Sequence, residues 1–428
     1  MDTTKGDTTI RVKKILFMTN SESGQANTIL AMALEATTRP HVEVHIASFP
    51  ALKRRVERLS QKINFHPLDG KDMLEMMAVQ GIPWETFPHP PTTKCCEPYD
   101  RTTTAILTVW NGECAFYFLL LLCMWVVIDV RRIFGPAYVR LCDNIKRIIE
   151  GVDPDIVVVD TLLNAGFDAC RSLNRRFVMN SPNSPVDTAR EYQPWLKGLW
   201  YYQMFVLPTR SQRLFIVSIR LGTGISFPVP WSDLLKNTKA AFRFLWIIVT
   251  SPKISKLNKY RNAHGLPGRL PVMDTIHTRA DHVICAGVRE IDFPLVVPDF
   301  LGLYGPIVLD TTPIETADSE LNRWLGRGET VVMCMGTHVY YTESRVKAVI
   351  NGFLGGINHD SNTQFLWKLS EKSKFESLIE ETLKDPRDKD RFKIVDWLEA
   401  DPASIMKHPN VIAYIHHGGA NSYFEAAL

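Results

Sequence analysis

The stretch that decides the fold is VIAYIHHGGANSYFEAAL, residues 411–428. It starts with the hydrophobic run of a strand, turns at Gly418 and Gly419, and continues with a helical pattern that opens at Asn421 and Ser422. A strand that passes through glycines into a helix is the repeating unit of a parallel α/β sheet. The stretch therefore predicts an α/β fold.

The same stretch also predicts a binding site for a phosphate-bearing ligand. The first N–H groups of a helix are unpaired and carry partial positive charge, and glycines let an oxyanion approach the backbone. His417, Asn421 and Ser422 add side-chain donors, and Glu425 follows one helical turn later, where it can accept from two ribose hydroxyls. The alternative is purely structural, with Asn421 and Ser422 capping the helix and the glycines only turning the chain.

Strand and helix patterns alternate through the first 181 residues. Strand-like segments occupy 13–20, 41–49, 63–68, 155–160 and 176–181, and helix-like segments occupy 26–36, 51–62, 138–151 and 164–174. The run DIVVVD at 155–160 is almost continuously apolar, which is typical of a strand covered on both faces. These segments predict a parallel sheet with helices on both sides.

A second series of alternating segments begins near Asp281. Its strand-like segments are 282–287, 329–338, 364–369, 392–398 and 411–417, and its helix-like segments are 344–356 and 421–428. Residues 185–280 lack a clean period, and we assign them to the first domain as irregular helices. Gly, Pro and Asp cluster at 302–315 and mark a boundary. We expect two doubly wound Rossmann-like domains, 1–300 and 301–428, which face one another across a cleft.

Composition excludes several classes of protein. The 49 basic and 46 acidic residues leave a net charge of only +3 without a long basic run, so nucleic acid is not an expected partner. The eight cysteines lack zinc-type spacing, and the N-terminus is polar. We therefore expect a cytoplasmic protein with reduced thiols.

Two apolar stretches leave alternatives open. Cys114 to Ile128 carries no charge, but a membrane span needs roughly 20 apolar residues. We expect a buried helix or an element that contacts the membrane surface, rather than a span. Trp195 to Pro208 is rich in aromatic residues, and it either packs in the core or lines a pocket for an apolar ligand.

Residues 397–426, WLEADPASIMKHPNVIAYIHHGGANSYFEA, resemble the donor-binding signature of the UDP-glycosyltransferases of the GT-B fold, especially the fungal ones. Residues 320–338 resemble the start of that family's donor domain, and ILFMTNSESGQANTILA and PDIVVVD resemble its acceptor domain. The resemblance implies a UDP-sugar donor and no metal or other cofactor. It also implies inversion at the anomeric carbon by direct attack of an acceptor hydroxyl.

Carried over residue by residue, the resemblance implies a UDP site made of Gly336, Thr337, Trp397, His417, Gly418, Gly419, Asn421, Ser422 and Glu425. Trp397 would stack on the uracil, and Glu425 would bind the ribose. The other residues would surround the diphosphate. The family's usual glutamine after this tryptophan is missing from LEADPASIM, so the contacts to the edge of the uracil are not assigned.

The catalytic base is the point where the chain departs most from the family. Gln25 stands where many relatives carry a catalytic histidine, and an amide does not titrate near neutral pH. Asp160 matches the aspartate that orients this histidine. Asp160 can act directly, Glu22 or His338 can take the role, or Asp160 only caps the helix that follows its strand.

The resemblance also implies segments beyond Leu428, including a pair of side chains that binds the donor sugar. We therefore expect an incomplete second domain, which binds a nucleotide sugar but does not transfer it. The first functional hypothesis is a transferase of a hexose to a hydroxyl of a small hydrophobic acceptor, such as a sterol or polyketide. The alternative is an inactive, truncated relic that binds nucleotide sugars.

Overall fold

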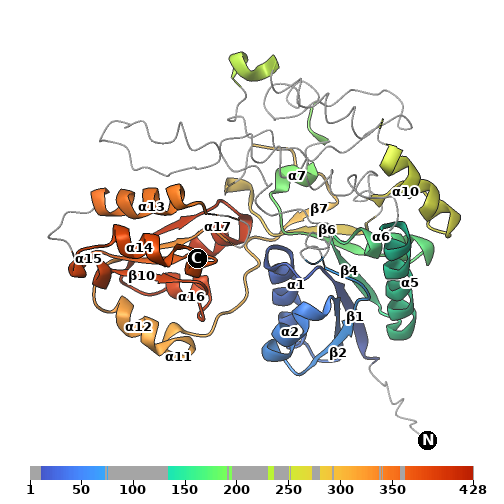
Figure 1. Cartoon of the computed structure of the whole chain (residues 1–428). Helices are drawn as coiled ribbons and strands as arrows, with labels where there is room; N and C mark the ends of the chain where they lie inside the picture. The colour runs from blue at the N-terminus through green and yellow to red at the C-terminus, as the bar shows by residue number, and fades with distance from the viewer. Residues whose placement is uncertain are drawn as a thin grey trace, which may run out of the picture. The chain divides into compact units, whose positions relative to one another are not determined.

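The computed structural model describes residues 11–72, 75, 134–189, 192–194, 230–235, 250, 252–271, 280–291, 294–336, 339, 341–356 and 362–427. These residues form two compact units, which are divided between Leu309 and Asp310 (Figure 1). The apolar stretches Cys114 to Ile128 and Trp195 to Pro208 lie outside the described residues.

The first unit is built on a parallel sheet of seven strands in the order β3-β2-β1-β4-β5-β6-β7. The strands are β1 (Lys13–Met18), β2 (Val42–Ser48), β3 (Ile63–Pro67), β4 (Ile156–Asp160), β5 (Val178–Ser181), β6 (His282–Cys285) and β7 (Leu301–Leu303). The chain runs outward from β1 to β3 and then returns to place β4 on the other side of β1. The carboxyl ends of β1 and β4 therefore form the topological switch point of this sheet, where ligands of open α/β sheets bind.

Helices cover both faces of this sheet (Figure 1). They are α1 (Ser23–Ala36), α2 (Lys53–Leu59), α5 (Phe134–Val152), α6 (Asn164–Ser172), α7 (Pro185–Ala189) and α10 (Pro252–Ala263), with short 3₁₀ turns at Pro50–Leu52, Trp231–Asp233 and Arg289–Ile291. Helices α1 and α2 bury Ile29, Leu30 and Val56 against one face. Helices α5 and α6 bury Ile145 and Phe167 against the other. The doubly wound α/β fold predicted for this region is confirmed.

Strand β6 belongs to the first sheet, as expected from a domain boundary at residue 300. The segment at 282–287 opens the second run of alternating patterns in the sequence, but β6 pairs with β5, residue Val178 lying opposite His282. Strand β7, which has only three residues and was not predicted, pairs with β6. Both strands thus extend the first sheet. Their pairing could not be predicted from the sequence, because it depends on contacts between segments that are distant along the chain.

The second unit has a parallel sheet of four strands in the order β10-β9-β8-β11. The strands are β8 (Thr330–Cys334), β9 (Gln364–Lys368), β10 (Phe392–Val395) and β11 (Val411–His416). The helices are α11 (Ile314–Ala317), α12 (Ser319–Leu325), α13 (Glu343–Gly356), α14 (Glu376–Thr382), α15 (Pro386–Arg391), α16 (Pro402–Met406) and α17 (Ala420–Ala427), with a 3₁₀ turn at Lys372–Phe375. The switch point of this sheet lies between β8 and β11.

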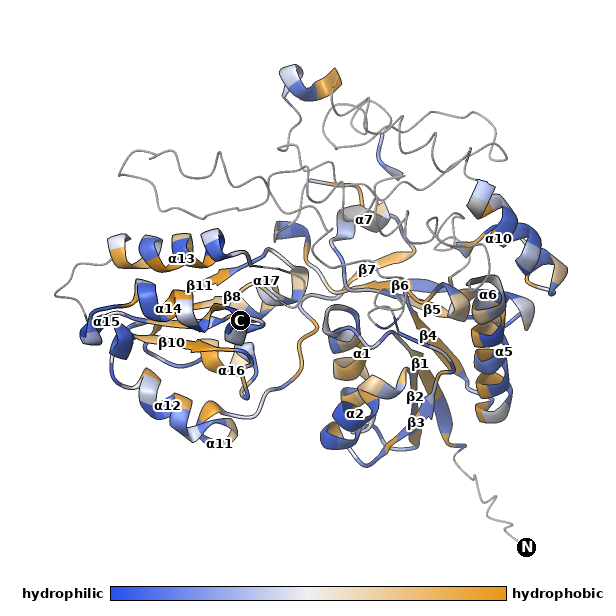
Figure 2. Cartoon of the chain, viewed as in Figure 1, coloured by the Kyte–Doolittle hydropathy of each residue, from blue (hydrophilic) through white to orange (hydrophobic). Residues whose placement is uncertain are grey.

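The core of the second unit has two layers, one on each face of its sheet. Val346 and Ile350 of α13 pack with Trp367 on one face, and Leu321 and Leu325 of α12 belong to the core on the other. Figure 2 shows hydrophobic residues along the strands of both units. The short helices of this unit were not predicted, since four to seven residues are too few to establish a helical period.

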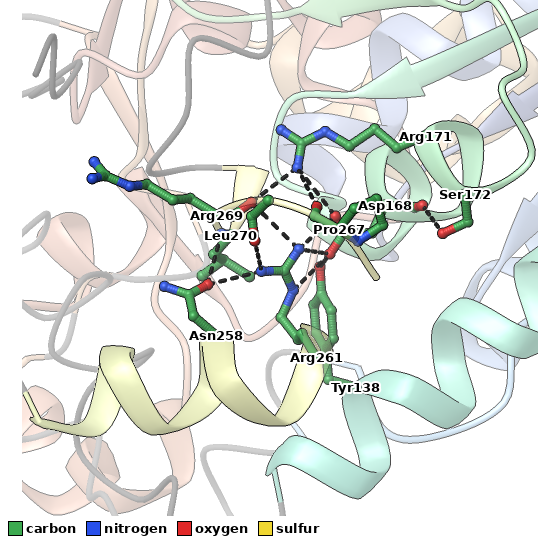
Figure 3. A network of polar contacts seen from close by, with 10 residues as sticks. Tyr138, Asp168, Arg171, Ser172, Asn258, Arg261, Pro267, Arg269 and Leu270 are labelled. Atoms are coloured by element: carbon green, nitrogen blue, oxygen red, sulfur yellow. Dashed lines mark hydrogen bonds and ion pairs between the residues drawn. The ribbon is translucent and has the colours of Figure 1, made fainter. Parts of the chain in front are cut away.

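A buried ionic network joins three helices of the first unit (Figure 3). Arg261 of α10 and Asp168 of α6 are both 0% exposed, and the guanidinium donates to the two carboxylate oxygens at 2.7 and 2.8 Å. The hydroxyl of Tyr138 on α5 donates to Asp168 at 2.6 Å. Arg261 also donates to Asn258 Oδ1 at 2.8 Å and to the carbonyl of Gly268 at 3.3 Å. The network therefore fixes the end of α10 and the loop after it against α5 and α6.

Within the described part of the chain, no helix is both long enough and apolar enough to cross a membrane.

Candidate functional site

The predicted phosphate site lies at the switch point of the second sheet. His416 at the end of β11 lies opposite Cys334 at the end of β8, so the residues that follow these two strands are neighbours. Gly336 and Gly418 have φ values of 76° and 78°, a region that side chains with a Cβ rarely adopt. Both turns therefore depend on glycine.

The ring of His417 packs tightly between glycines of these two turns. A Cβ on Gly336 would lie 2.9 Å from His417 Cε1, and a Cβ on Gly419 would lie 2.4 Å from His417 Nε2. Both distances are shorter than real carbon contacts, so any larger residue would displace the ring. The two glycines thus position the imidazole, and the structure brings together three of the residues that the sequence assigned to this site.

Helix α17 starts directly after these glycines. The N–H of Tyr423 donates to the carbonyl of Gly419 at 2.9 Å, which closes the first turn of the helix. Asn421 and Ser422 lie in this first turn and are half-buried. The helix start therefore offers backbone and side-chain donors, together with the positive end of its dipole.

Glu425 lies near the hydroxyl of Tyr414, a residue of β11. Burial raises the pKa of Tyr414, and the nearby Cys334 thiol and Glu425 carboxylate act in the same direction. The phenol consequently stays protonated at neutral pH. Glu425 lies one turn along α17, and its contact with a ribose stays a prediction.

His416 has a structural role in this turn. Its Nδ1 accepts from the N–H of Gly418 at 3.2 Å, and its ring stacks on Tyr414 with centroids 5.2 Å apart. Burial lowers the pKa of His416, which keeps Nδ1 available as an acceptor. The two adjacent histidines therefore have different surroundings, because successive side chains of a strand point to opposite faces.

Trp397 follows β10 and is 61% exposed. The ammonium of Lys368, at the end of β9, lies 4.1 Å from the centroid of the Trp397 ring. An exposed indole at the carboxyl edge of a parallel sheet can stack on a planar base. Thr337 and His338 lie outside the described residues, so their assignments stay predictions.

Asp160 lies at the switch point of the first sheet and is 0% exposed. It accepts from Thr19 Oγ1 at 2.9 Å and from the N–H of Leu162 at 3.1 Å. Burial raises its pKa to about 6, although hydrogen bonds from Leu162, Thr19 and Asn20 oppose the shift. Asp160 thus ties the loop after β1 to the loop after β4.

Gln25 and Glu22 lie at the start of α1. The carbonyl of Glu22 accepts from the N–H of Gln25 at 3.0 Å and from that of Ala26 at 2.9 Å, so Glu22 is the residue from which the helix begins. Gln25 Oε1 is buried and has no hydrogen-bond partner within the described ranges. Asp160 bonds to Thr19 and not to Gln25 in the part of the chain that the structure describes, so the partner of this aspartate is a hydroxyl rather than the residue at the histidine position.

The sequence interpretation missed Thr19 and Lys368. Thr19 is 0% exposed and Lys368 is 8% exposed. The sequence did contain a signal for both residues, because each is a polar residue near the end of a segment predicted as a strand. A polar residue at that position faces the ligand edge of a parallel sheet.

The chain is similar to several known proteins. Residues 270–428 match the family model described as UDP-glucoronosyl and UDP-glucosyl transferase. Glycosyltransferase sdnJ of Sordaria araneosa is 28% identical over 96% of this chain and 77% of its own length. A UDP-glycosyltransferase of Talaromyces amestolkiae is 22% identical over 66% of this chain and 51% of its own length. The chain thus spans about three quarters of the first relative and about half of the second.

Solved structures show the same fold. A UDP-glucosyltransferase of Polygonum tinctorium aligns with a TM-score of 0.53 at 15% identity, over 98% of this chain and 78% of its own. A Medicago truncatula glycosyltransferase complexed with UDP-glucose also aligns with a TM-score of 0.53, at 14% identity, over 97% of this chain and 77% of its own. The two parallel sheets, the signature at residues 397–426 and these relatives agree: residues 270–428 match the UDP-glycosyltransferase family model, and the chain as a whole is similar to UDP-glycosyltransferases of the GT-B fold.

Proposed function

We propose that this chain binds a UDP-sugar in its C-terminal unit and belongs to an enzyme that transfers the hexose to an acceptor hydroxyl with inversion. The main support for this proposal is the turn in which Gly336 and Gly419 position His417 beside the start of α17. In this proposal the diphosphate lies at that turn, together with Thr337, Gly418, Asn421 and Ser422. The uracil stacks on Trp397, and Glu425 binds the ribose.

The proposed reaction is a single displacement. The acceptor oxygen forms a bond to the anomeric carbon while the bond from that carbon to the diphosphate breaks. The acceptor proton passes to a base, and UDP leaves with the bonding electron pair. Backbone N–H groups of α17 and the side chain of His417 stabilise the charge that grows on the diphosphate. The proposal needs no metal or other cofactor.

The base is the least constrained part of this proposal. A carboxylate with a pKa of about 6 is ionised at neutral pH and suits general-base chemistry. However, Asp160 is fully buried, and Thr19 and Leu162 occupy its oxygens. We therefore propose that Asp160 contributes by holding the loop that carries Glu22 and Gln25, with Glu22 and His338 as candidates for the proton acceptor.

The burial of Asp160 also favours a second candidate function, which is nucleotide-sugar binding without transfer. Gln25 cannot take a proton, and Asp160 is occupied by structural hydrogen bonds. A chain with an intact UDP site and no accessible base would bind the donor but leave it unreacted.

We propose a small hydrophobic acceptor, such as a sterol or a polyketide. A mouse relative, 22% identical over 67% of this chain and 48% of its own length, is named 2-hydroxyacylsphingosine 1-beta-galactosyltransferase. Its name describes transfer to a lipid, which supports an apolar acceptor here. A cytoplasmic location with peripheral membrane contact is also a proposal, and cell fractionation tests it.

Two measurements separate the candidate functions. Calorimetry with UDP tests the donor site, and a UDP-release assay with UDP-glucose, followed by mass analysis of the product, tests transfer. If the chain transfers, Asp160→Asn should lower turnover by about 10²–10⁴-fold, the usual contribution of a positioned base or of its support. Gln25→Ala should lower it less.

Equal turnover of Asp160→Asn and the parent would remove Asp160 from the mechanism. UDP binding without any sugar transfer would favour the second candidate function.

A further inference from the structure

Lys368 is a buried cation with no carboxylate partner among the residues that the structure describes. It is the last residue of β9 and is 8% exposed, and its described neighbour is the ring face of Trp397, 4.1 Å from Nζ. No carboxylate in the described part of the chain forms an ion pair with it. Burial lowers the pKa of Lys368, although the nearby Cys334 thiol acts in the opposite direction; the net shift reflects the cost of keeping this charge away from water.

Another lysine of the same unit shows the usual arrangement. Lys393 Nζ lies 6.0 Å from the ring of Trp324 and 3.2 Å from Glu320 Oε1. Its charge is therefore balanced by a carboxylate, whereas the contact of Lys368 with Trp397 supplies only the quadrupole of an indole. The difference points to an anion that the protein itself does not provide.

The position of Lys368 indicates which anion. Lys368 lies opposite Cys334 in the strand register, and Cys334 is two residues before the Gly336 turn. The strand order β10-β9-β8-β11 places Lys368 between the strand that leads to Trp397 and the strands that lead to the glycine turns. Along the edge of the sheet, the ring of Trp397 comes first, then the ammonium group of Lys368, then the turns at Gly336 and Gly418. A nucleotide lying along this edge would place its base on the ring and its phosphates by the ammonium group and the turns.

At this edge the next lysine along the chain, Lys372, lies beside Asp396, to which its backbone N–H donates at 2.6 Å, whereas Lys368 is itself the last residue of its strand. Within the described ranges, the four strand ends and the two residues after each of them contain no other permanently charged cation. A nucleoside diphosphate carries several negative charges, and a cation shielded from water attracts it more strongly than an exposed one does. The histidine and the helix start alone would leave this charge only partly balanced.

We propose that Lys368 is a further donor-binding residue, whose ammonium group holds the phosphates of a UDP-bearing ligand; this rests on the proposed UDP site. The ring of Trp397 holds the ammonium group in the absence of ligand. The lysine therefore contributes charge to the phosphates, while the tryptophan contributes stacking to the base.

Calorimetry with UDP and with uridine tests this proposal, since uridine lacks the phosphates. Lys368→Met keeps the apolar stem and removes the charge, and it should weaken UDP binding by about tenfold or more while changing uridine binding by less than about twofold. Lys368→Arg should restore most of the UDP affinity. Lys393→Met, which removes the paired lysine, should leave both affinities unchanged.

An equal loss of UDP and uridine affinity in Lys368→Met would overturn the proposal and show that the lysine acts only by orienting Trp397. Unchanged UDP affinity would overturn it as well. If the parent chain binds neither ligand, the proposed UDP site itself fails. Should the methionine variant not fold, as judged by thermal melting, Lys368→Gln takes its place in the same comparison.

Discussion

Two buried cations of this protein have opposite surroundings. Arg261 in the first unit donates to both oxygens of Asp168 and to backbone carbonyls, so its charge and its N–H groups are satisfied (Figure 3). Lys368 in the second unit touches the face of an exposed tryptophan and has no acidic partner within the described ranges.

The presence or absence of a carboxylate partner distinguishes two roles of a buried cation. A cation that is fully paired inside the protein can only support the fold, because a ligand has nothing left to bind. A cation that is buried but unpaired costs free energy in the unliganded state and recovers it when an anion binds. We therefore expect the first region to contribute to stability and propose that the second contributes to ligand binding.

The largest test of this comparison is Arg261→Met. Removing the guanidinium leaves the carboxylate of Asp168 buried without its main partner, which should lower the free energy of unfolding by about 3–5 kcal/mol. Urea denaturation measures this loss. Arg176→Met is the matched control, since Arg176 pairs with Asp281 at 2.9 Å but its side chain is 85% exposed, and such pairs contribute about 0–1 kcal/mol. Equal losses in the two variants would contradict a stabilising role for the network.

Trp397→Ala should weaken UDP binding by about 1–3 kcal/mol, because the variant loses base stacking. Calorimetry gives the affinity, and circular dichroism checks that the chain is folded. Trp231→Ala serves as the control, since Trp231 is 81% exposed but belongs to the first unit. A folded Trp397→Ala chain with the parent's UDP affinity would show that the uracil lies elsewhere.

Gly419→Ala should also weaken UDP binding, by roughly 1–3 kcal/mol. The added Cβ would lie 2.4 Å from His417 Nε2, so the imidazole must move away from the phosphate turn. Gly352→Ala is the control within the same unit, because its Cβ would meet nothing within 4 Å and alanine is the better helix former. That control should bind UDP normally and melt at a slightly higher temperature.

Lys368→Met tests the comparison through its effect on the stability of the unliganded chain. Without ligand, the variant should be as stable as the parent or slightly more stable, because methionine removes an unpaired buried charge without leaving a cavity. Thermal melting in the absence of UDP measures this effect. A large loss of stability would place Lys368 in the same class as Arg261 and weaken its assignment to the ligand.

The smallest effect concerns two histidines of the first unit. His45 Nδ1 and His66 Nε2 lie 2.9 Å apart, and burial lowers the pKa of both rings. The unfolded chain therefore binds protons first as the pH falls through about 6.5, so this contribution to stability is present above that value and is lost below it. His66→Gln should reduce the loss of unfolding free energy between about pH 7.5 and pH 5.5. An unchanged pH dependence would show that the pair does not titrate differently on folding.

Much of the fold could be predicted from local sequence. The strands at 13–20 and 155–160 were visible because hydrophobic runs followed by turn residues are local signals, and both sheets were expected to be parallel. The short helices and β7 were not predicted, since elements of three to seven residues do not define a period. The predicted boundary at residue 300 placed β6 in the first domain, but its pairing with β5 came from the structure.

The turn at Gly418 and Gly419 is determined by the sequence itself, because glycines between a strand and a helix predict a tight turn whatever surrounds it; its role in binding a phosphate stays a proposal. The tertiary structure decided which charges are buried and what pairs with them. Asp160 meets Thr19 across 141 residues, and Asp168 meets Arg261 across 93. Lys368 lies against the ring of Trp397, with no carboxylate partner among the described residues. Burial and pairing of charges depend on contacts between distant segments, so they arise only when the chain has folded.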